Sequence, residues 1–240
     1  MEVALDVDFK EKGSAVADPF LEGVCLMGQV LGLAVGKPKE MDIGRNKTMM
    51  TGIGKEQVEG AMLRFAGFDG DASFDLKHHG GLDRSVCIFP KEHYSYFEEK
   101  FNRILLPGAF GENLTVSGLL EQDVAIGDVF QVGEVRIQVS EARNPCATIG
   151  KYHFMPALFK EVRSTSRTGF LCRTISEGKI QKGDEIVRVR REVDPISVAF
   201  CNEKVLHRMG KREELERISQ IEPLAARYRD EVLEKLRKMG

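Results

Sequence analysis

Residues Val129 to Val139 read VFQVGEVRIQV, and this stretch decides the fold class. Two short runs of apolar and β-branched residues, Val129–Val132 and Val135–Val139, flank the dipeptide Gly133-Glu134. Glycine supplies the positive φ angle that the first position of a type II′ turn requires. The pattern predicts an antiparallel hairpin with a two-residue turn, and therefore a body built largely from β-sheet.

The sequence on either side of this hairpin also favours strands joined by tight turns. A Gly-Asp turn enters a strand twice, in Ile126–Val129 and in Lys182–Ile186, which predicts two paired corners of a barrel. The other predicted strands are Gln29–Val35, Ser85–Phe89, Phe170–Ile175 and Glu185–Arg190. Before Asp194, helices are predicted only at Lys91–Phe101 and about Pro156–Arg163, so the regular helical crossovers of a parallel sheet are missing. We expect a mainly β protein with added helices (α+β), folded as a curved or closed, mainly antiparallel barrel.

The composition of the chain changes at Asp194. Of 24 glycines, 22 precede this residue, whereas 19 of the last 47 residues are charged. Glycine-poor, charge-rich sequence favours helices. We therefore divide the chain into an N-terminal extension at 1–22 with no assigned role, a barrel domain at 23–193, and a small three-helix domain at 194–240.

Three short helices are predicted in this tail. Asp194-Pro195 has the form of an N-cap followed by proline at the first helical position, and it opens a helix over Ile196–His207. The second helix is predicted at Lys211–Ser219, and Glu222-Pro223 opens the third. An apolar stripe on the third helix is formed by Leu224, Tyr228, Val232 and Leu236.

The overall composition excludes several classes of protein. The 240 residues carry a net charge of -2, whereas binding of a nucleic-acid polymer requires a basic excess. No apolar run approaches the ~18 residues of a membrane span, and the acidic N-terminus does not have the form of a signal peptide. The five cysteines are widely spaced and include no CxxC pair, so we expect no disulfide framework and a reducing, cytoplasmic compartment.

The first segment with potential chemistry is DLKHHGGLDR at residues 75–84. Its two glycines allow a tight backbone that exposes amides, and an arginine can grip phosphate through two hydrogen bonds. The residues concerned are Lys77, His78, His79, Gly80, Gly81 and Arg84. The segment suits an anionic ligand, or equally a polar turn whose histidines satisfy local backbone groups.

The second segment is RNPCATIGKYH at residues 143–153. Asn144-Pro145 is interpreted as a cap and first helical residue, which places Cys146 in the first turn of a helix. Helix amides and nearby cations favour a thiolate, which is a nucleophile or a soft metal ligand. The nearby basic residues are Arg143, Lys151 and His153. The alternative, a structural thiol, is favoured for the cysteines in apolar runs, which are Cys25, Cys87, Cys172 and Cys201.

The third segment is GAFGENLT at residues 108–115. It combines a tight turn with an acidic residue, Glu112, and an amide, Asn113. These two side chains can hydrogen-bond a heterocycle, because a carboxylate accepts from ring N–H groups. The alternative is a turn that only leads the chain into a strand.

Together these segments resemble the MOSC domain family, which is the domain found at the C-terminus of molybdenum-cofactor sulfurases. The resemblance is greatest to its stand-alone bacterial YiiM-like branch. It covers about residues 28–193, and the tail resembles the three-helix (3-alpha) appendage of the same branch. The matching segments are Lys77–Arg84, Phe110–Leu114, Val124–Asp128, Gln138–Cys146 and Lys151–His153.

The resemblance implies a MOSC-type β-barrel and a site for the molybdenum cofactor (Mo-molybdopterin), with the Cys146 thiolate as the metal ligand. The candidate catalytic residues are Cys146 and three proton donors, His79, Glu112 and His153. The candidate cofactor-binding residues are Lys77, His78, His79, Gly80, Gly81, Arg84, Asn113, Arg143, Asn144 and Lys151.

The family includes enzymes that reduce N-hydroxylated substrates, and the YiiM-like branch is associated with detoxifying base analogues such as hydroxylaminopurine. We therefore expect a molybdenum-dependent oxidoreductase. The chain carries no haem, flavin or iron–sulfur motif, so a separate reductase would supply the electrons. The sequence leaves the physiological substrate and the oligomeric state open.

Two other functions stay open at this point. Cys146 would carry a persulfide if the protein were a non-catalytic cofactor carrier or a sulfur-relay module. It would act as a nucleophile with His79 or His153 if the protein were a cysteine hydrolase, although no oxyanion-hole signature accompanies it.

Overall fold

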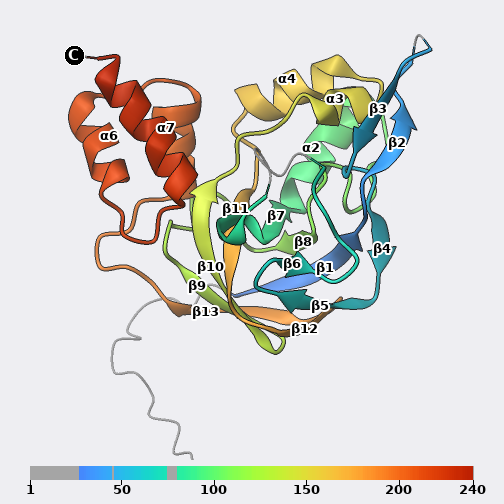
Figure 1. The fold of residues 1–240 in the computed structure, drawn as a ribbon, viewed down its shortest axis with the longest axis horizontal. Coiled ribbons are helices and arrows are strands. Elements are labelled where there is room, and N and C mark those ends of the chain that lie inside the picture. The colour runs from blue at the N-terminus through green and yellow to red at the C-terminus, as the bar shows by residue number, and fades with distance from the viewer. Residues whose placement is uncertain (1–26, 45, 75–79, 240) are drawn as a thin grey trace, which may run out of the picture.

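The computed structural model describes residues 27–44, 46–74 and 80–239, and its central feature is a closed β-barrel (Figure 1). Seven strands form the ring in the order β13-β9-β10-β11-β7-β8-β1, and pairing of β1 with β13 closes it. The ring strands are β1 (Met27–Val35), β7 (Val86–Pro90), β8 (Leu114–Ser117), β9 (Val129–Val132), β10 (Val135–Ala142), β11 (Phe170–Ser176) and β13 (Glu185–Arg190). Among the described strands, only β7 and β8 pair in parallel. The predicted mainly antiparallel barrel is confirmed.

Shorter strands extend and flank this ring. The strand β4 (Glu56–Val58) pairs with the C-terminal end of β1, at residues 33–35. The strands β2 (Lys39–Asp42) and β3 (Thr48–Thr51) pair with each other in an antiparallel ribbon. A three-stranded sheet contains β5 (Gly60–Arg64), β6 (Gly67–Phe68) and β12 (Gly178–Gln181). None of these short strands was predicted from the sequence.

The hairpin and the two Gly-Asp corners have the predicted geometry. Val132 pairs with Val135 across the turn, and Gly133 has a φ angle of 54°. Gly127 and Gly183 both have a φ angle of 93°. In each corner the following aspartate accepts a hydrogen bond from the backbone three residues earlier, at 2.9 Å for Asp128 and 2.7 Å for Asp184. The two corners lead into β9 and β13, which pair with each other.

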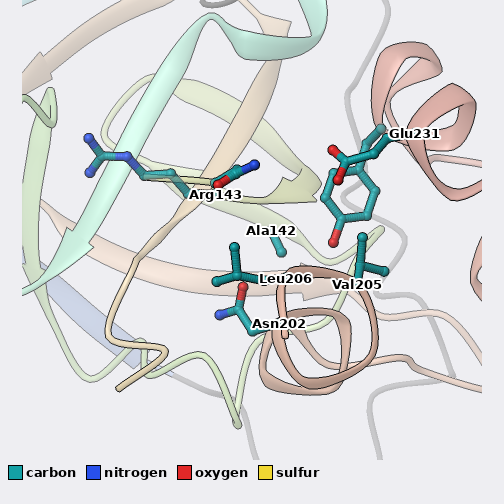
Figure 2. Close-up of a pocket in the computed structure, with 8 residues that line it drawn as sticks. Ala142, Arg143, Asn202, Val205, Leu206 and Glu231 are labelled. Carbon is teal, nitrogen blue, oxygen red and sulfur yellow. The ribbon is translucent and has the colours of Figure 1, made fainter. Parts of the chain in front are cut away.

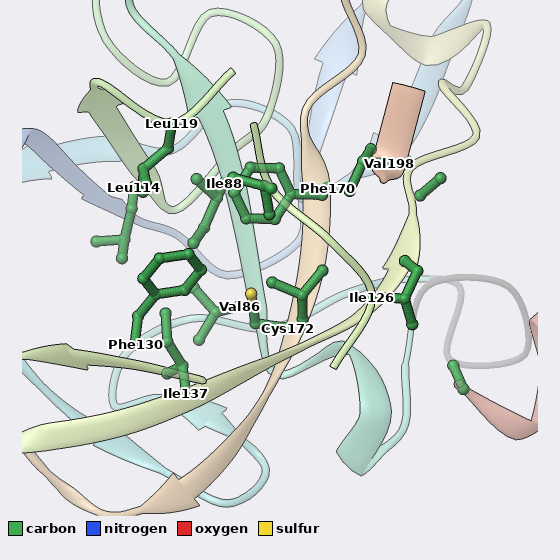
Figure 3. Close-up of a cluster of buried hydrophobic side chains, with 14 of the residues drawn as sticks. Val86, Ile88, Leu114, Leu119, Ile126, Phe130, Ile137, Phe170, Cys172 and Val198 are labelled. Carbon is green, nitrogen blue, oxygen red and sulfur yellow. The ribbon is translucent and has the colours of Figure 1, made fainter. Parts of the chain in front are cut away.

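Apolar side chains from all sides of the ring fill the barrel (Figure 3). Because side chains alternate between the two faces of a strand, every second residue points inward. Figure 3 shows this interior, and its fully buried members include Val86, Ile88, Leu114, Phe130, Ile137, Phe170 and Cys172. Cys172 therefore has the packing role predicted for it, and burial raises its pKa well above the usual range.

Three helices cover one end of the barrel around a second, aromatic core. They are α2 (Glu92–Phe101), α3 (Thr148–Tyr152) and α4 (Pro156–Ser164), and Figure 1 shows them grouped together. The rings of Phe89 and Phe110 stack with centroids 4.2 Å apart, and Tyr94 meets Phe110 edge-on at 5.3 Å. This core holds the turn at 108–111 against α2, so the third sequence segment has a rigid support.

The helical tail begins later than predicted. Its first helix, α5 (Val198–Cys201), is capped by the Ser197 hydroxyl, which accepts from the Phe200 amide at 3.1 Å. A π-helical turn, η2 (Asn202–Leu206), continues it. The predicted cap at Asp194 is wrong, because Ser197 lies at the point where the backbone turns helical.

The other two tail helices are α6 (Arg212–Ser219) and α7 (Ala226–Arg237). The predicted start of α7 at Glu222-Pro223 is wrong, because residues 222–224 form a turn whose carbonyl groups accept from the Arg229 guanidinium instead. The predicted stripe of Tyr228, Val232 and Leu236 is buried, and it joins the same apolar core as the barrel. Across the part of the chain that the structure describes, no helix is long and apolar enough to span a membrane.

The tail docks on the barrel through its connection to α7. Ala225 donates its amide to Ser140 at 2.8 Å, and Ala226 donates its amide to the Asp83 carboxylate at 3.1 Å. Asp83 also pairs with Arg173, with the Nη2 to Oδ1 distance 2.8 Å. Because Asp83 belongs to the first sequence segment, that segment is tied directly to the tail.

Replacement of Asp83 by alanine should lower the free energy of unfolding by about 1 kcal/mol, since the carboxylate is partly exposed but accepts from both a guanidinium and a helix amide. Asp194→Ala is the matched control, because Asp194 pairs with Arg217 on the open surface and its loss should have almost no effect. Equilibrium denaturation would measure both, and equal losses would contradict a docking role for Asp83.

Candidate functional site

Cys146 lies in the segment that connects β10 to α3. The Sγ atom is half-buried and is 3.1 Å from the Thr148 hydroxyl oxygen. The helix α3 starts at Thr148 with Ala147 at its N-cap, so the predicted placement of Cys146 in the first helical turn is wrong. Asn144 does not cap this helix, because its Oδ1 accepts from the Arg163 guanidinium at 2.9 Å.

Arg143 supplies the most specific sign of a ligand. Its Nη2 donates to the Phe110 carbonyl at 2.5 Å, but its Nη1 is buried and has no hydrogen-bond partner among the described residues. A buried donor left unpaired costs about 1–3 kcal/mol, so such atoms are rare unless a ligand or water completes them. Arg143 therefore offers an unfilled cationic donor three residues before Cys146.

A small cavity lies beside the backbone of Arg143, between β10 and the tail (Figure 2). Its volume is about 10 Å³, which is near the lower limit for a single water molecule. Asn202 lines it with an Oδ1 atom that is buried and unpaired within the described structure. Figure 2 shows the Arg143 side chain extending away from this cavity, which is far too small for a pterin.

Glu112 is fully buried beneath the turn of the third segment. Its carboxylate accepts from the amides of Gly108 at 2.9 Å and Phe110 at 3.0 Å, and from the Thr115 hydroxyl at 2.8 Å. The Tyr94 hydroxyl also donates to it. Burial and this carboxylate raise the pKa of Tyr94. These contacts give Glu112 a role in holding the turn, and its role as a proton donor stays a prediction.

Asn113 lies in a network of polar side chains that sequence reasoning missed. Its Nδ2 donates to Asp71 at 2.9 Å, and its Oδ1 accepts from the Cys87 amide at 3.1 Å. Asp71 also forms a nearly buried ion pair with Lys55. Lys55 and Asp71 are 16 residues apart in a region with no recognisable motif, so nothing in the sequence pointed to them.

Cys87 was assigned to packing, but the Arg143 charge acts on its thiol. Burial raises the pKa of Cys87, and the Arg143 guanidinium only partly opposes this. Cys87 is therefore a neutral thiol near the candidate site, which distinguishes it from a thiolate ligand. Cys201 is fully buried in the tail, where burial raises its pKa to about 12, and Cys25 lies outside the described residues.

His153 connects the second segment to the third. Its Nε2 lies 2.7 Å from the Ala109 carbonyl oxygen, which requires the ring to carry its proton on Nε2. Burial lowers the pKa of His153 below its ordinary value of 6.5, so the ring is neutral at pH 7. The side chain supports the turn at 108–111 through Nε2, and its Nδ1 has no hydrogen-bond partner among the described residues.

The lowered pKa of His153 makes the protein less stable in acid. As the pH falls below about 6.5, the unfolded chain takes up this proton before the folded protein does, so the free energy of unfolding decreases. His153→Gln retains an N–H donor for Ala109 and removes the titration. We expect the variant to lose less stability than the wild type between about pH 8 and about pH 5. Denaturation at both pH values checks this, and identical losses would contradict it.

The first segment is only partly described. Lys77, His78 and His79 lie outside the described residues, whereas Gly80, Gly81 and Arg84 lie within them. Arg84 forms a two-pronged ion pair with the buried Glu141 of β10, at 2.6 Å and 2.9 Å. Burial raises the pKa of Glu141, and Arg84 opposes that effect. The contact places this segment beside the end of β10, two residues from Arg143.

Contacts therefore bring the three segments together. Arg84 joins the first segment to β10 through Glu141, while Arg143 and His153 join the second to the third through Phe110 and Ala109. Lys151 is exposed on α3, and Asn144 is exposed beside it in the chain. Within residues 27–44, 46–74 and 80–239, no group of three His, Cys, Asp or Glu side chains is arranged to hold a metal ion. The fold and site define a mixed-barrel protein in which the half-buried Cys146 shares a short segment with Arg143, whose Nη1 is unpaired among the described residues.

Comparison with known proteins identifies this class. The family model of the MOSC domain matches residues 75–187. The uncharacterised protein YflK of Bacillus subtilis (strain 168) is 38% identical over 207 residues, covering 86% of this chain and 93% of YflK. The crystal structure of YiiM from Geobacillus stearothermophilus superposes with a TM-score of 0.73 at 31% identity, covering 87% of this chain and 99% of that one.

The chain belongs to the MOSC domain family. Within that family it is similar to the YiiM-like proteins, as the match to the YiiM structure shows. A more distant relative, named "Reductase" in Gibberella moniliformis (strain M3125 / FGSC 7600), is 29% identical over 215 residues, covering 88% of this chain but 38% of that protein. The resemblance stated from the sequence motifs is confirmed.

Proposed function

We propose that this protein binds the molybdenum cofactor through Cys146 and reduces N-hydroxylated compounds, such as hydroxylaminopurine, with electrons from a separate reductase. The observation that carries the proposal is the half-buried Cys146 thiol in the same short segment as the unpaired Nη1 of Arg143. Membership of the MOSC family supports the cofactor. The relative named as a reductase supports the reaction class.

The residues present fit such a cofactor. A thiolate suits a soft metal, and one protein ligand is enough where the remaining ligands come from the cofactor itself. The unfilled Arg143 nitrogen and the exposed Lys151 ammonium suit the phosphate of a pterin. Arg84, Lys77, His78 and the glycines at 80 and 81 are proposed to complete the anion site, as are Asn113 and Asn144.

The proposed reaction converts R–NH–OH, two electrons and two protons into R–NH2 and water. When bound, the cofactor would supply the electron pair to the N–O bond. The protein would orient the cofactor through Cys146 and Arg143 and would supply protons. His153 holds its Nε2 proton on Ala109, so Nδ1 is the atom at which it would accept or return a proton. His79 is the other proposed donor, and the turn held by Glu112 would shape the pocket wall.

A turnover assay tests the proposed reaction. Protein made in a host that synthesises the molybdenum cofactor would be mixed with a reduced dye and 6-N-hydroxylaminopurine, and formation of the amine would be followed by chromatography. Adenine is the expected product, at a rate that depends on the metal content of the sample. Cofactor-loaded protein that leaves hydroxylaminopurine unchanged would overturn the reductase assignment.

The same preparation discriminates the sulfur-relay alternative. Intact-protein mass spectrometry would detect a persulfide on Cys146 as one added sulfur atom. A persulfide together with protein that retains no molybdenum would favour the relay and contradict the reductase. An unmodified Cys146 with metal bound would support the proposal.

A further inference from the structure

A separate cleft lies between α2, α5 and the loops at 120–122 and 165–167. Its volume is about 590 Å³, within the range of small-molecule sites, which runs from about 300 to 1,000 Å³. None of the residues that line it belongs to the candidate site around Cys146. The cleft therefore needs an explanation of its own.

A buried pair of side chains forms the wall of this cleft. His93 and Glu121 are 9% and 5% exposed, and the His93 Nε2 lies 2.7 Å from one Glu121 oxygen. The other oxygen accepts from the amides of Thr168 at 2.9 Å and Gly169 at 2.7 Å. The other ring nitrogen, Nδ1, has no hydrogen-bond partner among the described residues. The pair thus holds the His93 ring in a fixed position in the cleft wall.

Arg167 supplies a cation to the same cleft. Its guanidinium carbon lies over the Tyr96 ring, 4.0 Å from the ring centroid, and this cation–π contact helps to hold the Arg167 side chain in the cleft. Among the described residues Arg167 makes no hydrogen bond or close ion pair, and its charge acts at longer range on Glu161, which already accepts from Lys100. The donors of its guanidinium are therefore open to an incoming carboxylate, which matches the guanidinium in size and geometry.

The loop that carries Arg167 is held in an unusual conformation. Ser166 has a φ angle of 58°, which costs a residue with a side chain about 1 kcal/mol or more and persists only where surrounding contacts enforce it. Its hydroxyl lies 2.7 Å from the His207 Nε2, and its carbonyl accepts from Asn202 at 3.3 Å. Asn202 begins the π-helical turn, a rare geometry that occurs frequently at functional sites. The tail therefore braces the loop that places Arg167.

We propose that this cleft binds a small zwitterion, namely an amino acid or a short peptide. Arg167 would bind the carboxylate, while the His93 Nδ1 and the carboxylates of Glu92 and Glu99 would receive the ammonium group. Three acidic residues against one arginine disfavour a polyanion such as a nucleotide, because like charges repel in a partly desolvated site. Leu120 and Ala199 add apolar wall for a side chain.

Calorimetry on the full chain tests this site. The twenty protein amino acids would first be compared by thermal shift, and the strongest would be titrated together with its N-acetyl and its carboxamide derivatives. We expect saturable binding of the free amino acid and at least about tenfold weaker binding of both derivatives, since each lacks one charge. Equal binding of the carboxamide, or no saturable heat at about 10 mM of any amino acid, would overturn the proposal.

Two substitutions connect the binding to Arg167. Arg167→Gln should weaken binding by at least about tenfold, and Arg167→Lys should restore it only in part because the ammonium cannot pair with two oxygens at once. Arg237→Gln is the matched control, because Arg237 is exposed on α7 away from the cleft, and it should bind normally. An Arg167→Gln protein that binds as tightly as this control would contradict the assignment.

Discussion

Replacement of Cys146 by alanine should reduce the turnover of 6-N-hydroxylaminopurine by at least about 100-fold, because loss of a direct metal ligand exceeds the 10–100-fold effect typical of residues behind the ligands. The fold should be unaffected, since Cys146 is half-buried and its Sγ lies against the hydroxyl of the partly exposed Thr148. We expect the unfolding temperature to change by no more than about 2 °C. Steady-state kinetics with a reduced dye and a thermal melt measure the two effects.

Cys201→Ala is the matched control for this experiment. Cys201 is fully buried among the tail helices, so its truncation should lower stability by about 1 kcal/mol while sparing turnover at 25 °C. We therefore expect opposite results for the two variants. Cys146→Ala should lose turnover but keep its stability, whereas Cys201→Ala should lose stability but keep its turnover. A Cys146→Ala protein that turns over at the wild-type rate would contradict the account.

Replacement of Glu112 by alanine should lower the free energy of unfolding by about 3–5 kcal/mol, the range seen when a buried charged network is broken. Its carboxylate satisfies the amides of Gly108 and Phe110 and the hydroxyls of Tyr94 and Thr115, and none of these donors would find water inside the core. Urea denaturation measures the loss. Glu213→Ala on the exposed face of α6 is the control and should change stability by less than about 0.5 kcal/mol.

The Glu112 result also separates two roles for this residue. If Glu112 only holds the turn, the Glu112→Ala variant should lose activity only to the extent that it unfolds. Below its melting temperature, each folded molecule should then turn over substrate at the wild-type rate. A loss of stability under about 1 kcal/mol combined with complete loss of turnover would instead favour the proton-donor role.

The barrel could be predicted from local chemistry because its turns need particular residues. Gly133 and the glycines of the two Gly-Asp corners, Gly127 and Gly183, adopt positive φ angles. The strands that follow the two corners, β9 and β13, pair with each other. The parallel pairing of β7 with β8 was not predictable in the same way. It depends on how α2 and the loop after it return the chain, which is a long-range property of the fold.

Helix starts were predicted less well than helix positions. Asp194, Glu222 and Asn144 each precede a proline and match the cap pattern, but the structure begins these helices at Val198, Ala226 and Thr148. Cap residues compete with other uses of the same side chain, and Asn144 is drawn to Arg163. Tertiary contacts therefore override the local preference, and the observed N-caps Ser197, Ala225 and Ala147 each lie three residues after the predicted ones.

The candidate site shows the same division between local and long-range information. Cys146 and Arg143 were accessible to sequence reasoning because charge and thiol occur in one short segment. Lys55, Asp71 and Cys87 were not, because their polar network exists only once separate loops and strands meet around Asn113. The unfilled Nη1 of Arg143 is visible only in three dimensions, since it depends on burial without a partner.

The most direct test of the central claim is the molybdenum and pterin content of the purified protein. Wild-type protein and Cys146→Ala would be made in the same cofactor-competent host, and metal would be measured by mass spectrometry and pterin by fluorescence after oxidation. The account predicts molybdenum approaching one atom per wild-type chain, with matching pterin, and a loss of at least about tenfold in the variant. Equal molybdenum in the two proteins, or none in the wild type, would contradict it.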